Sequence, residues 1–190
     1  INQSIGIDSP TKFYAGQHQF LQNTVNLDFS KRINPHLNLA FGGEYRFEQY
    51  QIDAGDAASY SGSGAESFTG FSPLNAVKGD RHSVATYVDG ELKFGDFTAN
   101  VAGRFENYSD FGNTLNGKLA LRYEYAKGYS VRGAISTGFR APSLHQLYFS
   151  ATSSLFLDGA ISNSGTFTND SRAAKLLGIP QLNEEKSKSV

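Results

Sequence analysis

The sequence predicts an all-β protein, a segment of an antiparallel transmembrane β-barrel with six strands and the start of a seventh. Three observations support this fold class. Apolar and polar residues alternate with a period of two along six runs, charged side chains keep to one face of each run, and the connections alternate between short and long. Aromatic residues reach 13% and glycines number 20, a composition that also favours β-structure.

The first two predicted strands form a hairpin. Residues 21–30 place leucine, valine and phenylalanine on one face, and amide, hydroxyl and acidic side chains on the other. Asn34-Pro35 is a turn signal, and residues 37–48 resume the alternation after it. Residues 1–17 contain several turn-forming residues and no clear period, so we expect a loop that leads into the first strand.

Four further runs continue the same alternation. They cover residues 83–94, 97–106, 118–125 and 129–140. Gly95-Asp96 forms a two-residue hairpin turn that relies on the backbone freedom of glycine, and residues 126–128 turn the chain into the last run. Pro142 ends that run, because proline gives no amide hydrogen to a β-ladder and holds the residue before it in an extended conformation.

Charged side chains are segregated in all six runs. The runs contain fourteen charged residues, and none shares a face with the apolar set of its own strand. A wall with lipid on one side and water on the other produces this pattern. An amphipathic sheet of a soluble sandwich shows the same alternation, so periodicity leaves both architectures open. In a barrel, the charges expected to face the lumen or a plug are Glu44, Arg46, Arg104, Glu106, Arg122, Arg132 and Arg140.

Connection lengths separate these two architectures. The three short turns alternate with three longer loops, which we place at residues 54–80, 109–116 and 141–183. Tight periplasmic turns and long outer loops are typical of outer-membrane barrels, whereas a sandwich has no reason to sort its loops. Aromatic residues also gather near both ends of the apolar faces, where interfacial girdles occur. We therefore favour the membrane wall, with the short turns on the periplasmic side.

Composition and charge exclude several other classes. The net charge of −1 lacks the basic footprint of a nucleic-acid-binding protein, and the absence of cysteine rules out a disulfide framework or a thiolate metal site. No apolar run is long enough for a membrane-spanning helix, and residues 1–10 have no signal-peptide pattern. We expect a piece of a longer chain, because the start looks internal and the last residues begin an alternation without a partner.

The long loops contain the candidate ligand contacts. Their aromatic side chains suit stacking or apolar contact with a ligand, although such residues equally pack loops together. They are Tyr60, Phe68, Phe71, Tyr148, Phe149 and Phe156. His82 and His145 lack carboxylates at ligand spacing, so neither a metal site nor a cofactor is expected. Ser143 and His145 have no orienting acid and no nucleophile-elbow glycines, so we expect no enzyme.

Several segments resemble the TonB-dependent outer-membrane receptors. Residues 138–144, with the sequence Gly-Phe-Arg-Ala-Pro-Ser-Leu, are similar to a segment found late in those barrels. Other similar segments follow the order of that family over nearly the whole chain. They lie at residues 13–16, 41–46, 70–73, 104–112 and 117–123. Each segment is short, but their order and their positions on the expected strands and loops make the combination specific.

The resemblance implies an active importer in the outer membrane of a Gram-negative bacterium. Family members have a barrel of 22 strands filled by an amino-terminal plug, and the TonB complex supplies energy through a motif ahead of the plug. Residues 1–190 would be part of that single barrel domain, without the plug. The implied partners are outer-membrane lipid, the plug, the TonB complex and a scarce nutrient: a ferric siderophore, a vitamin or a glycan. The alternatives are a passive porin and a soluble β-sandwich binding or adhesion module.

Overall fold

The computed structural model describes residues 1–65, 69–157 and 160–190, and β-strands dominate these residues. The strands are β1 (Gln17–Asn34), β2 (Leu37–Asp53), β3 (Val77–Phe94), β4 (Phe97–Tyr108), β5 (Gly112–Ala126), β6 (Tyr129–Arg140), β7 (Ala151–Leu157), β8 (Ala160–Thr166) and β9 (Glu185–Ser189). The helical turns are η1 (Gly6–Asp8), α1 (Ala57–Tyr60), α2 (Leu144–Tyr148) and α3 (Arg172–Leu176). Within the described ranges, none of the helices has the length and apolar character needed to cross a membrane.

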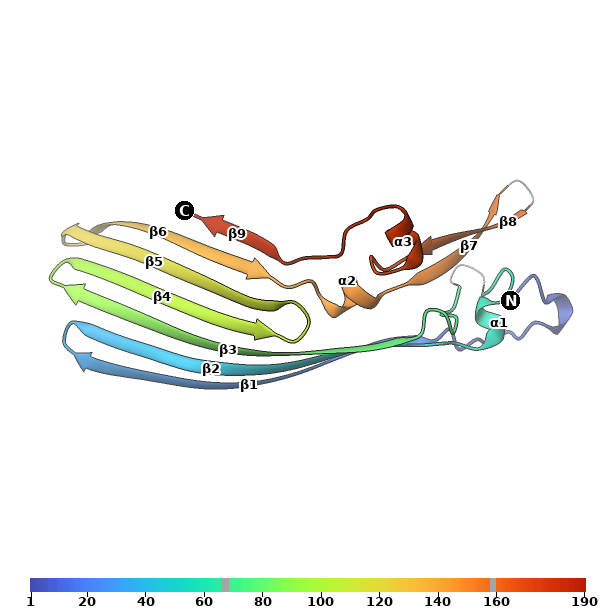
Figure 1. The fold of residues 1–190 in the computed structure, drawn as a ribbon, viewed down its shortest axis with the longest axis horizontal. Helices are drawn as coiled ribbons and strands as arrows, with labels where there is room; N and C mark the ends of the chain where they lie inside the picture. The colour runs from blue at the N-terminus through green and yellow to red at the C-terminus, as the bar shows by residue number, and fades with distance from the viewer. Residues whose placement is uncertain (66–68, 158–159) are drawn as a thin grey trace. The chain divides into compact units, whose positions relative to one another are not determined.

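Seven strands form one sheet in the order β1-β2-β3-β4-β5-β6-β9 (Figure 1). The pairings from β3 through β6 and β9 are antiparallel, and Arg140 of β6 lies opposite Glu185 of β9. This sheet confirms the predicted fold class of six strands and the start of a seventh. The sheet does not close into a barrel within the described residues.

Three tight turns connect β1 to β2, β3 to β4 and β5 to β6, and they gather at one end of the sheet (Figure 1). The β3–β4 turn has two residues, with Phe94 and Phe97 paired on either side of it. Gly95 adopts a φ of 57° there, a left-handed conformation that side chains with a Cβ adopt rarely. The sequence signal at Gly95-Asp96 therefore predicted this turn correctly.

The predicted eight-residue loop at 109–116 is wrong. β5 begins at Gly112, so only residues 109–111 separate it from β4, and Asn107 pairs with Asn113 across the two strands. The polar residues after Gly112 resemble a loop, but they alternate with the apolar Leu115 and join the ladder, which satisfies their backbone groups. Long loops therefore do not occupy every connection opposite the tight turns.

Three strands begin earlier than the sequence predicted, and the last long loop contains structure. β1, β3 and β5 start at Gln17, Val77 and Gly112. Most residues at these strand starts are polar or glycine, so they do not show an alternating apolar pattern in the sequence. Backbone hydrogen bonds to the neighbouring strand nevertheless hold them in the sheet. The predicted loop at 141–183 contains α2, the β7–β8 hairpin and α3, and Ala151 pairs with Thr166 in that hairpin.

The described chain divides into two compact units. The loop unit comprises Ile1–Leu21, Glu48–Asp80 and Pro142–Leu182, and the wall unit comprises Gln22–Phe47, Arg81–Ala141 and Asn183–Val190. The loop unit contains a hydrophobic cluster of Tyr50, Ile52, Phe71 and Leu144. The wall unit contains the length of strand next to the three tight turns.

One face of the wall unit, which we call the apolar face, consists of large hydrophobic side chains that are exposed on the surface of this chain. Val88 and Val101 are each about half exposed, at 50% and 51%. The register confirms that adjacent strands share this face: Val101 is opposite Leu119, and Leu119 is opposite Ile135. Similar exposure occurs at Val25, Leu27, Phe29, Phe41, Tyr45, Val84, Phe105, Leu121, Tyr123 and Val131. A continuous apolar surface of this kind suits contact with lipid.

Candidate functional site

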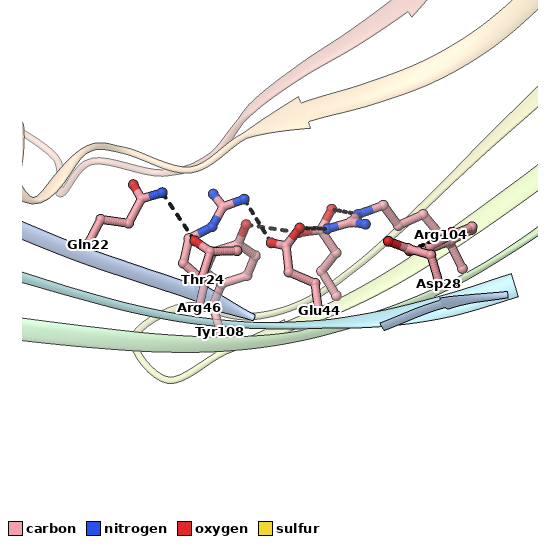
Figure 2. A network of polar contacts seen from close by, with 9 residues as sticks. Gln22, Thr24, Asp28, Glu44, Arg46, Arg104 and Tyr108 are labelled. Carbon is pink, nitrogen blue, oxygen red and sulfur yellow. Dashed lines mark hydrogen bonds and ion pairs between the residues drawn. The ribbon is translucent and has the colours of Figure 1, made fainter. Parts of the chain in front are cut away.

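The opposite face of the wall unit, which we call the polar face, contains a connected network of charges (Figure 2). Arg46 Nη2 donates to Glu44 Oε1 at 2.7 Å, and Arg104 Nη2 lies 3.4 Å from Glu44 Oε2. Arg104 Nε donates to Glu106 Oε1 at 2.8 Å, and the Tyr108 hydroxyl donates to Glu106 Oε2 at 2.9 Å. Each carboxylate therefore accepts two hydrogen bonds or ion pairs, and Glu44 links residues from β2 and β4.

A small residue on the intervening strand makes room for this network. Ala85 in β3 is opposite Glu106 in β4, and it is only 3% exposed. A Cβ at Gly43 would lie 3.5 Å from the carbonyl oxygen of Ala85, so β2 passes close to this position. The short Ala85 side chain leaves room beside Glu106, the carboxylate that accepts a hydrogen bond from Arg104. Four of the seven residues predicted for the lumen, Glu44, Arg46, Arg104 and Glu106, are thus brought together.

A second polar contact on the wall unit joins Asp28 to Tyr87. The Tyr87 hydroxyl donates to Asp28 Oδ1 at 2.7 Å. Gly42 lies against both groups, because a Cβ there would come within 2.7 Å of Asp28 Oδ1 and of the Tyr87 ring, and within 2.6 Å of the Leu27 carbonyl oxygen. The absence of a side chain at Gly42 is what lets this contact form.

The other three predicted lumen residues lie apart from the network. Arg122 pairs with Glu124 at 3.1 Å and is opposite Arg132 in the β5–β6 register. Arg140 is exposed at the end of β6, opposite Glu185 of β9. Like charges directly opposite each other on adjacent strands repel, so the Arg122–Arg132 position favours an anionic neighbour.

We predict that Glu44→Gln lowers the free energy of unfolding by about 1–2 kcal/mol. The change removes a charge that two guanidinium groups share, and charge-assisted hydrogen bonds contribute about 1.5–3 kcal/mol when well shielded. Here the Arg46 and Arg104 side chains are each 33% exposed, so water offsets part of the loss. Urea titration of the refolded receptor in detergent measures the effect.

Glu124→Gln is the matched control for Glu44→Gln. Its partner Arg122 is 54% exposed, and an exposed pair of this kind contributes little. We expect a change below about 0.5 kcal/mol at this position. If both variants lose the same free energy of unfolding, the pairing of Glu44 with two arginines does not stabilise the wall more than an exposed ion pair does.

The loop unit places the predicted ligand aromatics mainly in packing positions. Phe71 is 7% exposed within the hydrophobic cluster, and Tyr148 and Phe149 pack against that cluster. The Tyr148 ring covers Gly79, where a Cβ would come within 2.3 Å of it. Tyr60 is half-buried in α1. Phe68 lies outside the described residues, and for Phe156 only the backbone, in β7, is described.

Aromatic and imidazole rings meet beside this cluster. His18 in β1 and His145 in α2 have ring centroids 6.2 Å apart, and Tyr50 makes an edge contact with both rings. Together with Gln19, Phe20 and Ser143 they line a cleft of about 370 Å³. His82 belongs to the wall unit. Within the described ranges, no group of three or more His, Asp or Glu side chains is gathered as a metal-binding cluster.

Two titratable groups at the end of β2 have shifted pKa values. Tyr50 is the fourteenth residue of β2, beyond the stretch of about 9–11 residues that spans a membrane. Burial raises the pKa of its hydroxyl, so it stays protonated at neutral pH. Hydrogen bonds donated by Gln17 and Gln51 lower the pKa of Asp53, which keeps that carboxylate ionised.

Sequence reasoning missed several residues of these two regions. Tyr108 follows the predicted end of its strand by two residues, and its parity with Arg104 and Glu106 was the signal that would have placed it on the polar face. The Tyr87 contact with Asp28 joins strands that are not consecutive in the sequence. His18 and Tyr50 gave no signal, because only the fold brings them to His145.

The comparison with known families decides the identity of the fold. Residues 2–190 match the family model described as TonB dependent receptor-like, beta-barrel. The chain belongs to the TonB-dependent receptor family. The resemblance noted in the sequence is thus confirmed over almost its whole length.

Solved structures of bacterial receptors and of an iron transporter share the fold. A variant of the ferric enterobactin receptor PfeA from Pseudomonas aeruginosa matches with a TM-score of 0.56 and 12% identity, over 72% of this chain and 20% of that one. The siderophore receptor PirA from Acinetobacter baumannii gives 0.56 and 14%, over 91% and 24%. The FrpB iron transporter from Neisseria meningitidis gives 0.52 and 14%, over 67% and 21%. The chain therefore spans about a fifth to a quarter of the length of these proteins.

Proposed function

We propose that this chain forms part of the barrel wall of an outer-membrane receptor that imports a scarce nutrient with energy supplied through the TonB complex. The observation that carries the proposal is the family match over residues 2–190. Membership in a receptor family also favours transport over catalysis. The two-faced wall unit supports a location in the outer membrane of a Gram-negative bacterium, since an exposed apolar face opposite a charged face fits lipid on one side and water on the other.

For the cargo, we propose the ferric siderophore class among the expected nutrients. The support is that the fold neighbours PfeA, PirA and FrpB are described as receptors or transporters of iron or its siderophores. In this proposal the loop unit lies outside the membrane and meets the cargo, with exposed or half-buried rings such as His145 and Phe149 available for contact.

We propose that the polar face holds the plug domain of the same receptor. Charge-assisted hydrogen bonds between guanidinium and carboxylate groups are strong but can be exchanged when a partner moves. Glu44, Arg104 and Glu106 offer such groups in one place. Arg46 Nε is buried and has no hydrogen-bond partner among the described residues, so an acceptor from another part of the receptor would satisfy it.

Uptake measurements test the transport proposal. A strain that lacks the receptor should fail to grow on a ferric siderophore as its iron source, and a plasmid copy should restore both growth and uptake of labelled iron. Deletion of the TonB complex should abolish the restored uptake. If uptake persists without TonB, the chain belongs to a passive pore and the energy-coupled importer is wrong.

Charge reversal tests the plug proposal separately. Reversing Glu44, Arg46, Arg104 and Glu106 together in the complete receptor should loosen the plug, seen as faster proteolysis of the plug and reduced uptake. The matched control reverses Asp170 and Lys175, an exposed pair of the loop unit that lies outside the polar face. Unchanged plug retention and uptake in the fourfold variant would contradict the plug proposal.

A further inference from the structure

Two arginines of the polar face lie directly opposite each other in the wall unit, near the tight turn that joins β5 to β6. Arg122 of β5 is paired with Arg132 of β6 in the strand register, and both side chains are exposed. Side chains directly opposite each other on antiparallel strands have Cβ atoms about 4.5–5.5 Å apart, so the two positive charges repel each other. The pair therefore costs stability unless an anion lies beside both charges.

The charges around this pair are not balanced within the part of the chain that the structure describes. Arg122 Nη2 lies 3.1 Å from Glu124 Oε2, whereas Arg132 forms no hydrogen bond or ion pair with a described residue. Glu91 of β3 lies on the same face, but it is opposite Asn100, and β4 separates it from both arginines. Two arginines and one glutamate leave one positive charge in excess.

The two arginines line one cleft of about 480 Å³ in the wall unit. Small side chains form part of its lining, because Ala120 and Ala134 lie opposite each other on the same two strands. Asn100 of β4 lines the cleft opposite Ala120, and its side-chain amide already donates to Asp89 Oδ1 at 2.7 Å. The short alanine side chains leave room for another side chain beside both guanidinium groups.

We propose that Arg122 and Arg132 together bind one carboxylate side chain, an aspartate or a glutamate of the plug domain. A guanidinium group presents a planar fork of N–H donors that matches the two oxygens of a carboxylate. One carboxylate brings a single negative charge, which balances the charge that the arginines and Glu124 leave in excess. A doubly charged phosphate would instead leave an excess of negative charge. The site depends on the proposal that the plug lies against the polar face.

Neutralising one arginine tests whether a carboxylate is bound. In the complete receptor, Arg132→Gln should increase the rate of plug proteolysis about fivefold, the upper range for the loss of one exposed ion pair. Without a bound carboxylate, the change only relieves repulsion from Arg122. Plug proteolysis then keeps its wild-type rate and the receptor unfolds at higher urea, which overturns the proposal. Arg172→Gln, at an exposed position of α3 in the loop unit, is the matched control and should behave as the wild type.

Zero-length cross-linking identifies the carboxylate. Arg132→Lys keeps the positive charge and supplies an amine, which a carbodiimide joins to a carboxylate in contact with it. Mass spectrometry of the complete receptor should find residue 132 linked to an aspartate or glutamate of the plug. Lys175 Nζ lies 2.6 Å from Asp170 Oδ1, so the link between these two residues shows that the reagent has worked. Linkage of residue 132 only to wall residues such as Glu124, or no linkage at all, contradicts the proposal.

A charge exchange then tests the pair itself. Arg132→Glu should loosen the plug, and changing the cross-linked acid to arginine in the same chain should restore the wild-type rate of proteolysis. Failure to restore that rate in folded protein, checked by heat-dependent migration on a denaturing gel, contradicts the pairing. The two proposals fail separately. If reversal of the Glu44 network loosens the plug while residue 132 links to no plug residue, only the carboxylate site is wrong.

Discussion

Val88→Arg should lower the free energy of unfolding of the receptor in lipid vesicles by about 2–4 kcal/mol. This is the cost of placing a cation on the lipid face near the middle of the membrane. Val88 lies on the apolar face, six residues before β3 ends at Phe94 and the tight turn begins. Because a tilted spanning strand has about 9–11 residues, this position falls near the middle of the span. Urea-dependent folding into vesicles measures the change, and Val101→Arg, on the next strand, should behave alike.

The control for Val88→Arg puts the same charge on the polar face. Ala102→Arg places a guanidinium opposite Asp89 in the β3–β4 register and opposite Lys118 in the β4–β5 register, so one attractive and one repulsive neighbour offset each other at a water-facing position. We expect a change within about 0.5 kcal/mol, as for an ordinary accessible position. Val88 is already half exposed in this chain, so a water-facing surface would tolerate arginine there equally well. Equal effects at Val88 and Ala102 would therefore argue against a lipid-facing wall.

The two faces of the sheet could be predicted from the sequence because alternation is a local property. Each side chain of an extended strand points to the face opposite that of its neighbour. Val101 and Arg104 therefore lie on opposite faces of the sheet, independently of the rest of the fold. The tight turn at Gly95-Asp96 is local for the same reason, since only those residues set its backbone angles. The hairpin turn predicted at Gly95-Asp96 and the turn predicted at residues 126–128 are confirmed by the pairing of β3 with β4 and of β5 with β6.

The strand ends and the contents of the long loops depend on distant residues and could not be read locally. Thr114 and Asn116 look like loop residues, yet Glu106 and Arg104 pair with them across the sheet. The Ser- and Thr-rich β7–β8 hairpin gave no alternating apolar pattern, and its pairing alone defines it. Polar residues can occupy a strand wherever a neighbour supplies the hydrogen bonds.

The sequence predicted which face of the sheet the charged residues occupy, but not which of them contact each other. Alternation placed Glu44, Arg46, Arg104 and Glu106 on one face, but it gave no sign that Glu44 links the two arginines. The contact of Glu44 with Arg104 joins β2 to β4 across β3, where the small Ala85 lies opposite Glu106. Likewise the sequence analysis considered His145, whereas His18 becomes its neighbour only through the packing of α2 within the loop unit.

The segment after β6 explains why Leu144 is the strongest candidate for a destabilising change in the loop unit. Pro142 follows the strand, and Ser143 then caps α2: its hydroxyl accepts from the Gln146 amide, while the Gln146 side chain accepts from the Ser143 amide. This reciprocal cap begins the helix at Leu144. The Leu144 side chain is consequently buried, at 1% exposure, among Tyr50, Ile52 and Phe71.

Leu144→Ala should destabilise the loop unit by about 2–5 kcal/mol, the usual cost of emptying a leucine site in a packed core. The loss should be local, because this cluster and the strands of the wall unit belong to different compact units. Hydrogen exchange measures it: amides of Tyr50, Ile52 and α2 should exchange faster, while those of β4 and β5 keep their protection.

Leu176→Ala is the matched control for Leu144→Ala, since it removes the same atoms from a leucine of the loop unit that is 78% exposed at the end of α3. Its effect should stay within about 0.5 kcal/mol. Faster exchange throughout β4 and β5 in the Leu144 variant would show that the two units unfold together, and it would contradict a separately stable loop unit. Unchanged exchange at Tyr50 and Ile52 would instead mean that the cluster does not hold α2 in place. A loss confined to the loop unit follows only if Leu144 stabilises that unit without stabilising the wall unit.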